Sequence, residues 1–292
     1  MTNQPAQARS YFHASAADWQ NKASGAAGYS VIEGRHGAVL NVLKRMPQAR
    51  RFLDVGCGTG QLAIEVAARG LMSEGCDFAE AMIEQCRVNA SAAKSSAVFE
   101  LGSFFDLKYD DGAYDLISAQ GFIEYISLSD MEEFFRRVLR MLRPGGALVV
   151  GSRNRLFNAV SMNDYTRIEM DLGALPALFA EALDFATARM DGLEVVRTHE
   201  RVDPQPDVHP ITGIGVDTRY QFSPADLGGR LRRAGLTPAG IYPVHFHGLH
   251  PLVKAERPEL HEQFAGAVDA AAVYDLKLLP FCSTFVMEAR RT

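Results

Sequence analysis

Short apolar runs alternate along residues 51–152 with segments in which apolar residues recur at helical spacing, and the two patterns predict different elements. Short apolar runs with the length of buried strands occur at 51–55, 71–77, 97–101, 114–119 and 147–151. Apolar side chains that recur every three or four residues, as on one face of a helix, occur at 61–69, 80–89 and 129–142. Strands that alternate with helices in this way predict a parallel sheet with helices on both faces.

Local signals predict where two of the helices begin. Ser129 and Glu132 form a capping-box pattern, and Pro144-Gly145-Gly146 is expected to end that helix before the strand at 147–151. Ser223 and Pro224 predict the N-cap and first turn of a later helix. Two more strands are expected at 239–246 and 281–289, which gives seven in all.

The regular pattern stops near residue 153, and this break suggests a division of one domain, 1–292, into segments. The expected segments are an N-terminal helical cover (1–47), a cofactor-binding core (48–152), a lid insertion (153–217) with a loop around Pro204, Pro206 and Pro210, the rest of the core (218–246 and 281–292), and a second rim insertion (247–280).

Composition narrows the class of protein. The 292 residues carry a net charge of −5 and no long run of Lys or Arg, so a nucleic-acid partner is not expected. No apolar stretch is long enough to cross a membrane. The four cysteines form no C-x-x-C pair, which favours a reducing cytoplasm. The sequence does not indicate an oligomeric state.

A glycine-rich turn follows the strand at 51–55. Gly56, Gly58 and Gly60 alternate with other residues where the strand passes into a helix. A missing Cβ permits unusual backbone angles and lets a ligand approach the main chain closely. Asp54 stands at the strand end, where its carboxylate is placed to accept a hydrogen bond from an ammonium group. This combination predicts a ligand site at the turn.

Asp77 ends the next strand, 23 residues after Asp54. An acid at this place binds the two hydroxyls of a ribose in dinucleotide-binding sheets. The G-x-G-x-G spacing differs from the G-x-G-x-x-G of nicotinamide sites. An acid just before the first glycine also repels a pyrophosphate. A nucleoside cofactor with positive charge is therefore favoured.

With these residues the sequence resembles the class I methyltransferase family. The resembling segments are 52–60, 75–82, 114–118 and 139–146, together with the helix at 224–234 and the last two strands. The resemblance implies a Rossmann-like, doubly wound α/β sheet of seven mostly parallel strands in the order 3-2-1-4-5-7-6, with helical lid insertions. It also implies the cofactor S-adenosyl-L-methionine, with S-adenosyl-L-homocysteine as product.

The resemblance assigns cofactor contacts by position. The matching positions are Asp54, Gly56, Gly58, Gly60, Asp77, Phe78, Gln120 and Gly121. The glycines would line the methionine part of the cofactor and Asp54 would support its amine. Asp77 would hold the ribose, Phe78 would pack near the adenine, and Gln120 with Gly121 would face the methionine and the transferred methyl group.

One position departs from the family pattern. Many members carry an acid directly after the glycine that ends the third strand, whereas this chain has Ser103 after Gly102. Recognition of the adenine would then fall to Ser103, to the backbone of Phe104 or to Asp106.

The acceptor is expected beyond the carboxyl ends of the strands, where open α/β sheets bind ligands. Under the family topology both insertions lie at this rim, so we expect a roofed pocket sized for a small molecule. His245 and His247, which alternate along a strand, are candidate general bases. The alternative is that they, with His250, are hydrogen-bonded loop residues. A metal site is not expected, because H-x-H-x-x-H lacks nearby carboxylates.

Arginines near the rim suggest an anionic acceptor. Arg153, Arg155 and Arg219 are candidates to clamp a carboxylate or phosphate. The alternative, which the sequence favours equally, is that these arginines are solvated or connect the lid to the sheet. Glu124 and Tyr125, after the fourth strand, either touch the acceptor or cap the next helix.

The sequence thus predicts methyl transfer from S-adenosylmethionine to an oxygen or nitrogen of a small molecule, by in-line displacement in a lidded pocket. Two alternatives stay open. One is a nicotinamide-dependent oxidoreductase on the same fold, and the other is a non-catalytic protein that binds S-adenosylmethionine.

Overall fold

A computed structural model describes residues 4–15, 19–20, 30–206, 216 and 219–292 of the chain. Its centre is one seven-stranded sheet in the order β3-β2-β1-β4-β5-β7-β6. The strands are β1 (Arg51–Val55), β2 (Met72–Asp77), β3 (Val98–Leu101), β4 (Tyr114–Ala119), β5 (Leu142–Arg153), β6 (Leu236–Phe246) and β7 (Cys282–Arg291). Only β7 runs antiparallel to its neighbours, β5 and β6. The predicted fold class and strand order are confirmed.

Helices cover both faces of the sheet, because successive side chains of each strand point to opposite sides. Phe52 and Leu116 face a core shared with α3 (Val31–Lys44) and α4 (Gln61–Ala68). Leu53 and Ile117 face the opposite core, which includes α6 (Leu128–Met141) and α11 (Pro224–Arg233). Helix α5 (Glu80–Ala92) packs beside β3 and α4. This doubly wound arrangement leaves the strand ends as the place for a ligand.

Helix α6 differs from its predicted form at both ends. Its N-cap is Ser127, whose Oγ accepts a hydrogen bond from the Asp130 N–H at 3.0 Å, so Ser129 does not cap it. The helix stops at Met141, and β5 already begins at Leu142. Pro144-Gly145-Gly146 therefore lies inside the strand, at an irregularity in its pairing with β4.

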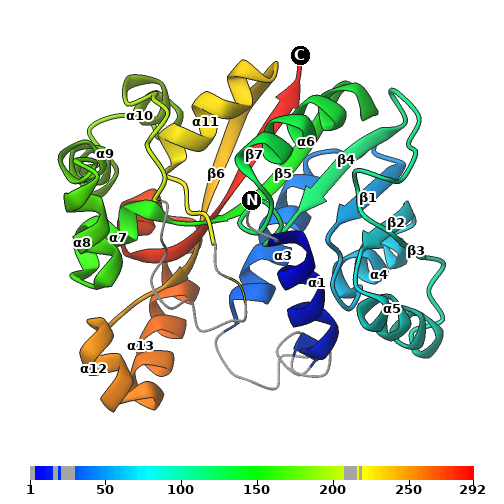
Figure 1. The fold of residues 1–292 in the computed structure, drawn as a ribbon, viewed down its shortest axis with the longest axis horizontal. Helices are drawn as coiled ribbons and strands as arrows, with labels where there is room; N and C mark the ends of the chain where they lie inside the picture. The colour runs from blue at the N-terminus through cyan, green and yellow to red at the C-terminus, as the bar shows by residue number, and fades with distance from the viewer. Residues whose placement is uncertain (1–3, 16–18, 21–29, 207–215, 217–218) are drawn as a thin grey trace.

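The remaining helices belong mostly to two connections that leave the sheet at the carboxyl ends of β5 and β6 (Figure 1). Between β5 and β6 lie α7 (Arg155–Ser161), α8 (Asp164–Asp171), α9 (Leu175–Thr187), α10 (Gly192–Thr198) and then α11. Between β6 and β7 lie α12 (Pro251–Glu256), α13 (Pro258–Ala271) and the 3-10 turn η1 (Leu276–Phe281). The N-terminal helix α1 (Gln4–Ala14) crosses in front of the same edge of the sheet.

Not every predicted segment is described in full. Pro210 of the expected loop lies outside the described residues, as do parts of the N-terminal cover and of the lid insertion. The segment boundaries suggested by the sequence stay a prediction. Within the part of the chain that the structure describes, no helix is both long and apolar enough to cross a membrane.

Candidate functional site

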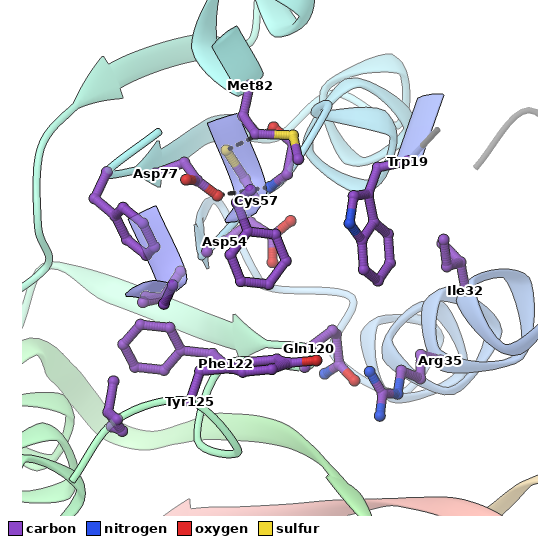
Figure 2. Close-up of a pocket in the computed structure, with 18 of the residues that line it drawn as sticks. Trp19, Ile32, Arg35, Asp54, Cys57, Asp77, Met82, Gln120, Phe122 and Tyr125 are labelled. Atoms are coloured by element: carbon purple, nitrogen blue, oxygen red, sulfur yellow. Dashed lines mark hydrogen bonds between the residues drawn. The ribbon is translucent and has the colours of Figure 1, made fainter. Parts of the chain in front are cut away.

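A cavity of about 800 Å³ lies at the carboxyl ends of β1, β2 and β4, and Figure 2 looks into it. Its walls come from the loops after these strands, from α1 and α3, and from the adjoining ends of β5, β6 and β7. Segments from the whole length of the chain therefore meet around one space, as expected for a site at the rim of an open α/β sheet.

The glycine-rich turn forms part of this wall. Gly56 and Gly58 have φ angles of 68° and 53°, in the left-handed region that favours glycine. A Cβ on Gly56 would also meet the Phe122 ring at 3.2 Å. Gly60 is not among the residues that line the cavity, and its contact with the cofactor stays a prediction. It begins α4, where a Cβ would lie 2.9 Å from Phe99, so its role is to let the turn pack against β3.

The two predicted acids reach the cavity from neighbouring strand ends (Figure 2). The Asp77 carboxylate accepts hydrogen bonds from the N–H of Gly58 at 3.1 Å and of Ala79 at 2.9 Å. Burial raises the pKa of Asp54 to about 7, although a hydrogen bond from Ser118 lowers it and the charge of Asp77 raises it further. Burial raises the pKa of Asp77 to about 6, against backbone hydrogen bonds that lower it. Two buried carboxylates of this kind are stabilised by a cationic ligand.

The other candidate cofactor residues surround the same space. Phe78, Ser103, Phe104, Gln120 and Gly121 all line the cavity. The Gln120 amide donates to the Val149 carbonyl at 2.9 Å, which fixes its orientation. Its Oε1 is buried and has no hydrogen-bond partner among the described residues, so it is available to a ligand donor.

Aromatic side chains close the cavity from the N-terminal side. Phe12 of α1 packs against Phe78 and Tyr125, with ring centroids 6.3 and 5.2 Å apart. Trp19 points toward the cavity from the same side (Figure 2). A ligand bound at the glycine-rich turn would therefore lie beneath α1.

Three arginines converge on one buried carboxylate beside the cavity. Glu124 is fully buried and lies 2.7 Å from Arg35 Nη2, 3.3 Å from Arg219 Nε and 4.0 Å from Arg153 Nε. Burial raises the pKa of Glu124, but the three guanidinium groups outweigh it and hold the pKa below its usual value. Glu124 therefore does not cap the next helix. It holds together arginines from α3, from the end of β5 and from the segment before α11.

Sequence reasoning did not identify Arg35, which is part of this cluster and lines the cavity. Its guanidinium lies over Gly121, where a Cβ would be 2.6 Å from Nη1. An arginine in an amphipathic helix carries no signal of such a position, because the packing of α3 on the sheet decides where it points. Lys254 of α12, which also lines the cavity, was missed for the same reason.

Arg155 is not brought to the cavity with Arg153 and Arg219. Its side chain is buried under α8, where it pairs with Glu169 at 2.5 Å and lies 3.8 Å from Asp203. Of the two interpretations offered by the sequence, the structural one holds for this arginine: it fastens the lid helices. It is not placed to bind an acceptor.

His245 and His247 both line the cavity, with ring centroids 4.9 Å apart. Burial lowers the pKa of His245 to about 3, and the charge of Lys254 lowers it further. Burial and Lys254 also lower the pKa of His247. Both rings are therefore neutral at pH 7 and weakly basic, which weighs against an efficient general base. His250 caps α12, where its Nδ1 accepts from the Leu252 N–H at 3.3 Å.

Residues 52–146 match a family model described as a methyltransferase domain. The demethylmenaquinone methyltransferase of Deinococcus radiodurans is 34% identical over 148 residues, which are 48% of this chain and 59% of that protein. The trans-aconitate 2-methyltransferase of Variovorax paradoxus is 28% identical over 199 residues, which are 62% of this chain and 74% of that protein. Five relatives with 30% to 35% identity are matched over only 35% to 59% of their length.

Solved structures extend the similarity of fold to nearly the whole chain. The magnesium protoporphyrin IX methyltransferase of Synechocystis, crystallised with S-adenosylhomocysteine, superposes with a TM-score of 0.58 over 99% of this chain and 100% of that chain. At 14% sequence identity this likeness concerns the fold alone.

The matched segment contains Gly56, Gly58, Asp77 and Gln120, all of which line the cavity. The seven-stranded sheet has the strand order that the resemblance to this family implied. Residues 52–146 thus match a methyltransferase domain, and this match together with the fold supports S-adenosylmethionine as the cofactor.

Proposed function

We propose that this protein transfers the methyl group of S-adenosylmethionine to an oxygen or nitrogen of a small, anionic molecule. One observation carries the proposal: a single cavity has the glycine-rich turn and its two acids on one side, and Arg153, Arg219, His245 and His247 on the other. Donor and acceptor bound on these two sides would meet inside it. A volume of about 800 Å³ suits a cofactor together with a small acceptor.

Different residues that line the cavity are suited to bind different parts of the cofactor. Asp54 and the open Oε1 of Gln120 are suited to accept hydrogen bonds from its ammonium group. The main chain at Gly56 and Gly58 is suited to pack against its methionine part. Asp77 would bind the ribose hydroxyls, and Phe78, with Ser103 and Phe104, would contact the adenine. Methyl transfer then needs an acceptor aligned with the carbon–sulfur bond.

The charge around the acceptor side supports an anionic acceptor. Arg35, Arg153 and Arg219 share one carboxylate, Glu124, and Lys254 adds a further positive group. Similarity to an enzyme named for trans-aconitate, an organic acid, agrees with this charge. Helices α1, α3 and α12 contribute side chains to the wall of the cavity, which suits a small molecule better than a macromolecule.

Two measurements test the proposal. S-adenosylhomocysteine is expected to raise the melting temperature of the full chain by several degrees, and NAD is not, because a ligand stabilises the fold only through its affinity for it. Asp77→Asn should reduce this shift, whereas Asp111→Asn, at an exposed surface position, should leave it unchanged. A shift with NAD alone would favour the oxidoreductase alternative.

Methyl transfer itself is tested with S-adenosylmethionine carrying a tritiated methyl group. The protein is incubated with a small-molecule extract of cells, and labelled products are separated from the cofactor. We expect label in organic acids. Stabilisation by S-adenosylhomocysteine without any labelled product would favour the non-catalytic binding protein.

A further inference from the structure

A side pocket of about 140 Å³ adjoins the main cavity. The two spaces share four lining residues, Arg153, Arg219, His247 and Ser283, which therefore form the boundary between them. Beyond this boundary the side pocket is lined by neutral groups, including Asn158, Tyr165 and Gln221, and by no carboxylate among the described residues. The side pocket is thus a polar space entered between two arginines.

The positive charge at this boundary is only partly compensated. Glu124 is the carboxylate nearest to Arg153, and at 4.0 Å the pair is too far apart for a hydrogen bond. Arg219 lies closer, at 3.3 Å, but shares the same carboxylate with Arg35. Among the described residues, one carboxylate therefore faces three guanidinium groups. Such a site is complementary to a further anion placed between Arg153 and Arg219.

We propose, on the basis of the methyl transfer proposed above, that the acceptor is a small acid with at least two carboxylates. One carboxylate is held by Arg153 and Arg219 at the mouth of the side pocket. The other lies in the main cavity and is methylated. Its oxygen attacks the methyl carbon, the carbon–sulfur bond breaks and its electron pair stays on sulfur. A methyl ester and a neutral thioether form, and no proton is transferred.

The surroundings favour a carboxylate over the other common acceptors. A carboxylic acid is already ionised at neutral pH, so this reaction requires no general base. A hydroxyl group requires one, and the neutral His245 and His247 are poor candidates because burial lowers their pKa values. An alkyl ammonium group would be repelled by Arg153, Arg219 and Lys254, all of which line the cavity.

Two readouts on the full chain test the inference. The first uses the tritiated cofactor with the cell extract: methyl esters release volatile methanol in mild alkali, whereas methyl ethers and methylamines do not. The second compares matched acids as ligands of the protein saturated with S-adenosylhomocysteine. The pairs are glutarate with valerate and isophthalate with benzoate. We expect alkali-labile label, and dicarboxylates that bind at least about tenfold more tightly than their monocarboxylate partners.

Matched variants test whether the preference for dicarboxylates comes from the two arginines at the boundary between the cavities. Arg153→Gln should remove most of the preference for dicarboxylates and raise the KM for the labelled acceptor, while the affinity for S-adenosylhomocysteine stays unchanged. Arg219→Gln should do the same. Arg136→Gln removes one positive charge from the exposed face of α6 and should change neither quantity.

The possible outcomes separate the two proposals. Alkali-stable label overturns the carboxylate acceptor but leaves methyl transfer intact. Equal binding of mono- and dicarboxylates, or an unchanged preference in both arginine variants, overturns the second anionic group. No label at all, with S-adenosylhomocysteine still bound, overturns the methyl transfer and the inference that rests on it.

Discussion

Asp54 illustrates at the scale of one residue how a ligand site costs stability. Its side chain is buried, and burial raises its pKa to about 7. The pKa of an aspartate in the unfolded chain is near 4. Because the folded pKa is higher, ionisation of Asp54 destabilises the unliganded fold as the pH rises from about 4 to about 7. A cationic ligand reverses this effect.

Asp54→Asn is therefore expected to stabilise the protein without cofactor and to abolish cofactor binding. The amide keeps the shape of the carboxylate and removes its charge. At pH 8 the free energy of unfolding should rise by about 1–3 kcal/mol, measured by urea denaturation. The thermal shift with S-adenosylhomocysteine should disappear. Undiminished binding by this variant would show that Asp54 does not contact the ligand.

Cofactor affinity should depend on pH through the same group. Under the proposed assignment the ionised form of Asp54 binds an ammonium group, and burial raises the pKa of Asp54 to about 7 and that of Asp77 to about 6. Affinity for S-adenosylhomocysteine should therefore increase from pH 5.5 to 7.5, and binding at pH 6.5 should release protons. Calorimetry in two buffers with different ionisation enthalpies measures this release. A pH-independent affinity over this range would contradict the assignment.

The meeting of Asp54, Gly56 and Gly58 at one wall of the cavity was predictable because these residues are local in sequence. Asp54, Gly56 and Gly58 belong to one strand and the turn after it, so a short motif places them together. The position of Arg35 and Lys254 at the cavity was not predictable, since each belongs to a helix that no sequence motif links to the glycine-rich turn. The sequence left two roles open for Arg155, because its position two residues after Arg153 says nothing about the lid packing that buries it.

Helix α6 shows at the scale of an element how competing local signals are resolved. Ser127 and Ser129 each precede an acid by three residues, so both fit a cap. In the fold Ser127 is the N-cap, and Ser129 lies in the first turn with its Oγ 2.9 Å from that of Ser127. Packing of Met131 and Phe134 in the core fixes the rotation of the helix and thereby its start.

Ser127→Ala should consequently destabilise the protein by about 1 kcal/mol, the usual cost of losing a cap. Ser129→Ala is the matched control and should cost clearly less. Both are measured by urea denaturation of the protein without cofactor. If Ser129→Ala proves the more damaging substitution, the start of the helix is assigned incorrectly.

The Glu124 cluster acts at the scale of the whole molecule, because it joins α3, the loop after β4, the end of β5 and the segment before α11. Burial opposes ionisation of Glu124, yet the three arginines lower its pKa below the reference value of 4.5. A lowered folded pKa stabilises the fold above about pH 4.5, and this contribution is lost as the pH falls through the folded pKa.

Glu124→Gln should reduce the free energy of unfolding by about 3 kcal/mol at pH 7, since it leaves buried guanidinium groups without their carboxylate. The difference from the unchanged protein should shrink in acid, as Glu124 itself becomes protonated. Glu133→Gln, in an exposed cluster with Arg136 and Arg137, should cost no more than about 0.5 kcal/mol. Urea denaturation at pH 7 and at pH 3 checks both; a loss equal at the two pH values would contradict the role assigned to the ionised carboxylate.

The sequence by itself determined the alternation of strands and helices, the strand order implied by the family motifs, and the glycine-rich turn with Asp54 and Asp77. The alternation follows from the hydrophobic period and the turn from residues a few positions apart, whereas the strand order is what the resemblance to the family implies. Tertiary structure alone decided which arginines meet at Glu124, that Arg155 belongs to the lid, and that a side pocket opens between Arg153 and Arg219. Such contacts depend on how elements that are distant in sequence pack together, and no local pattern of residues in the sequence encodes that packing.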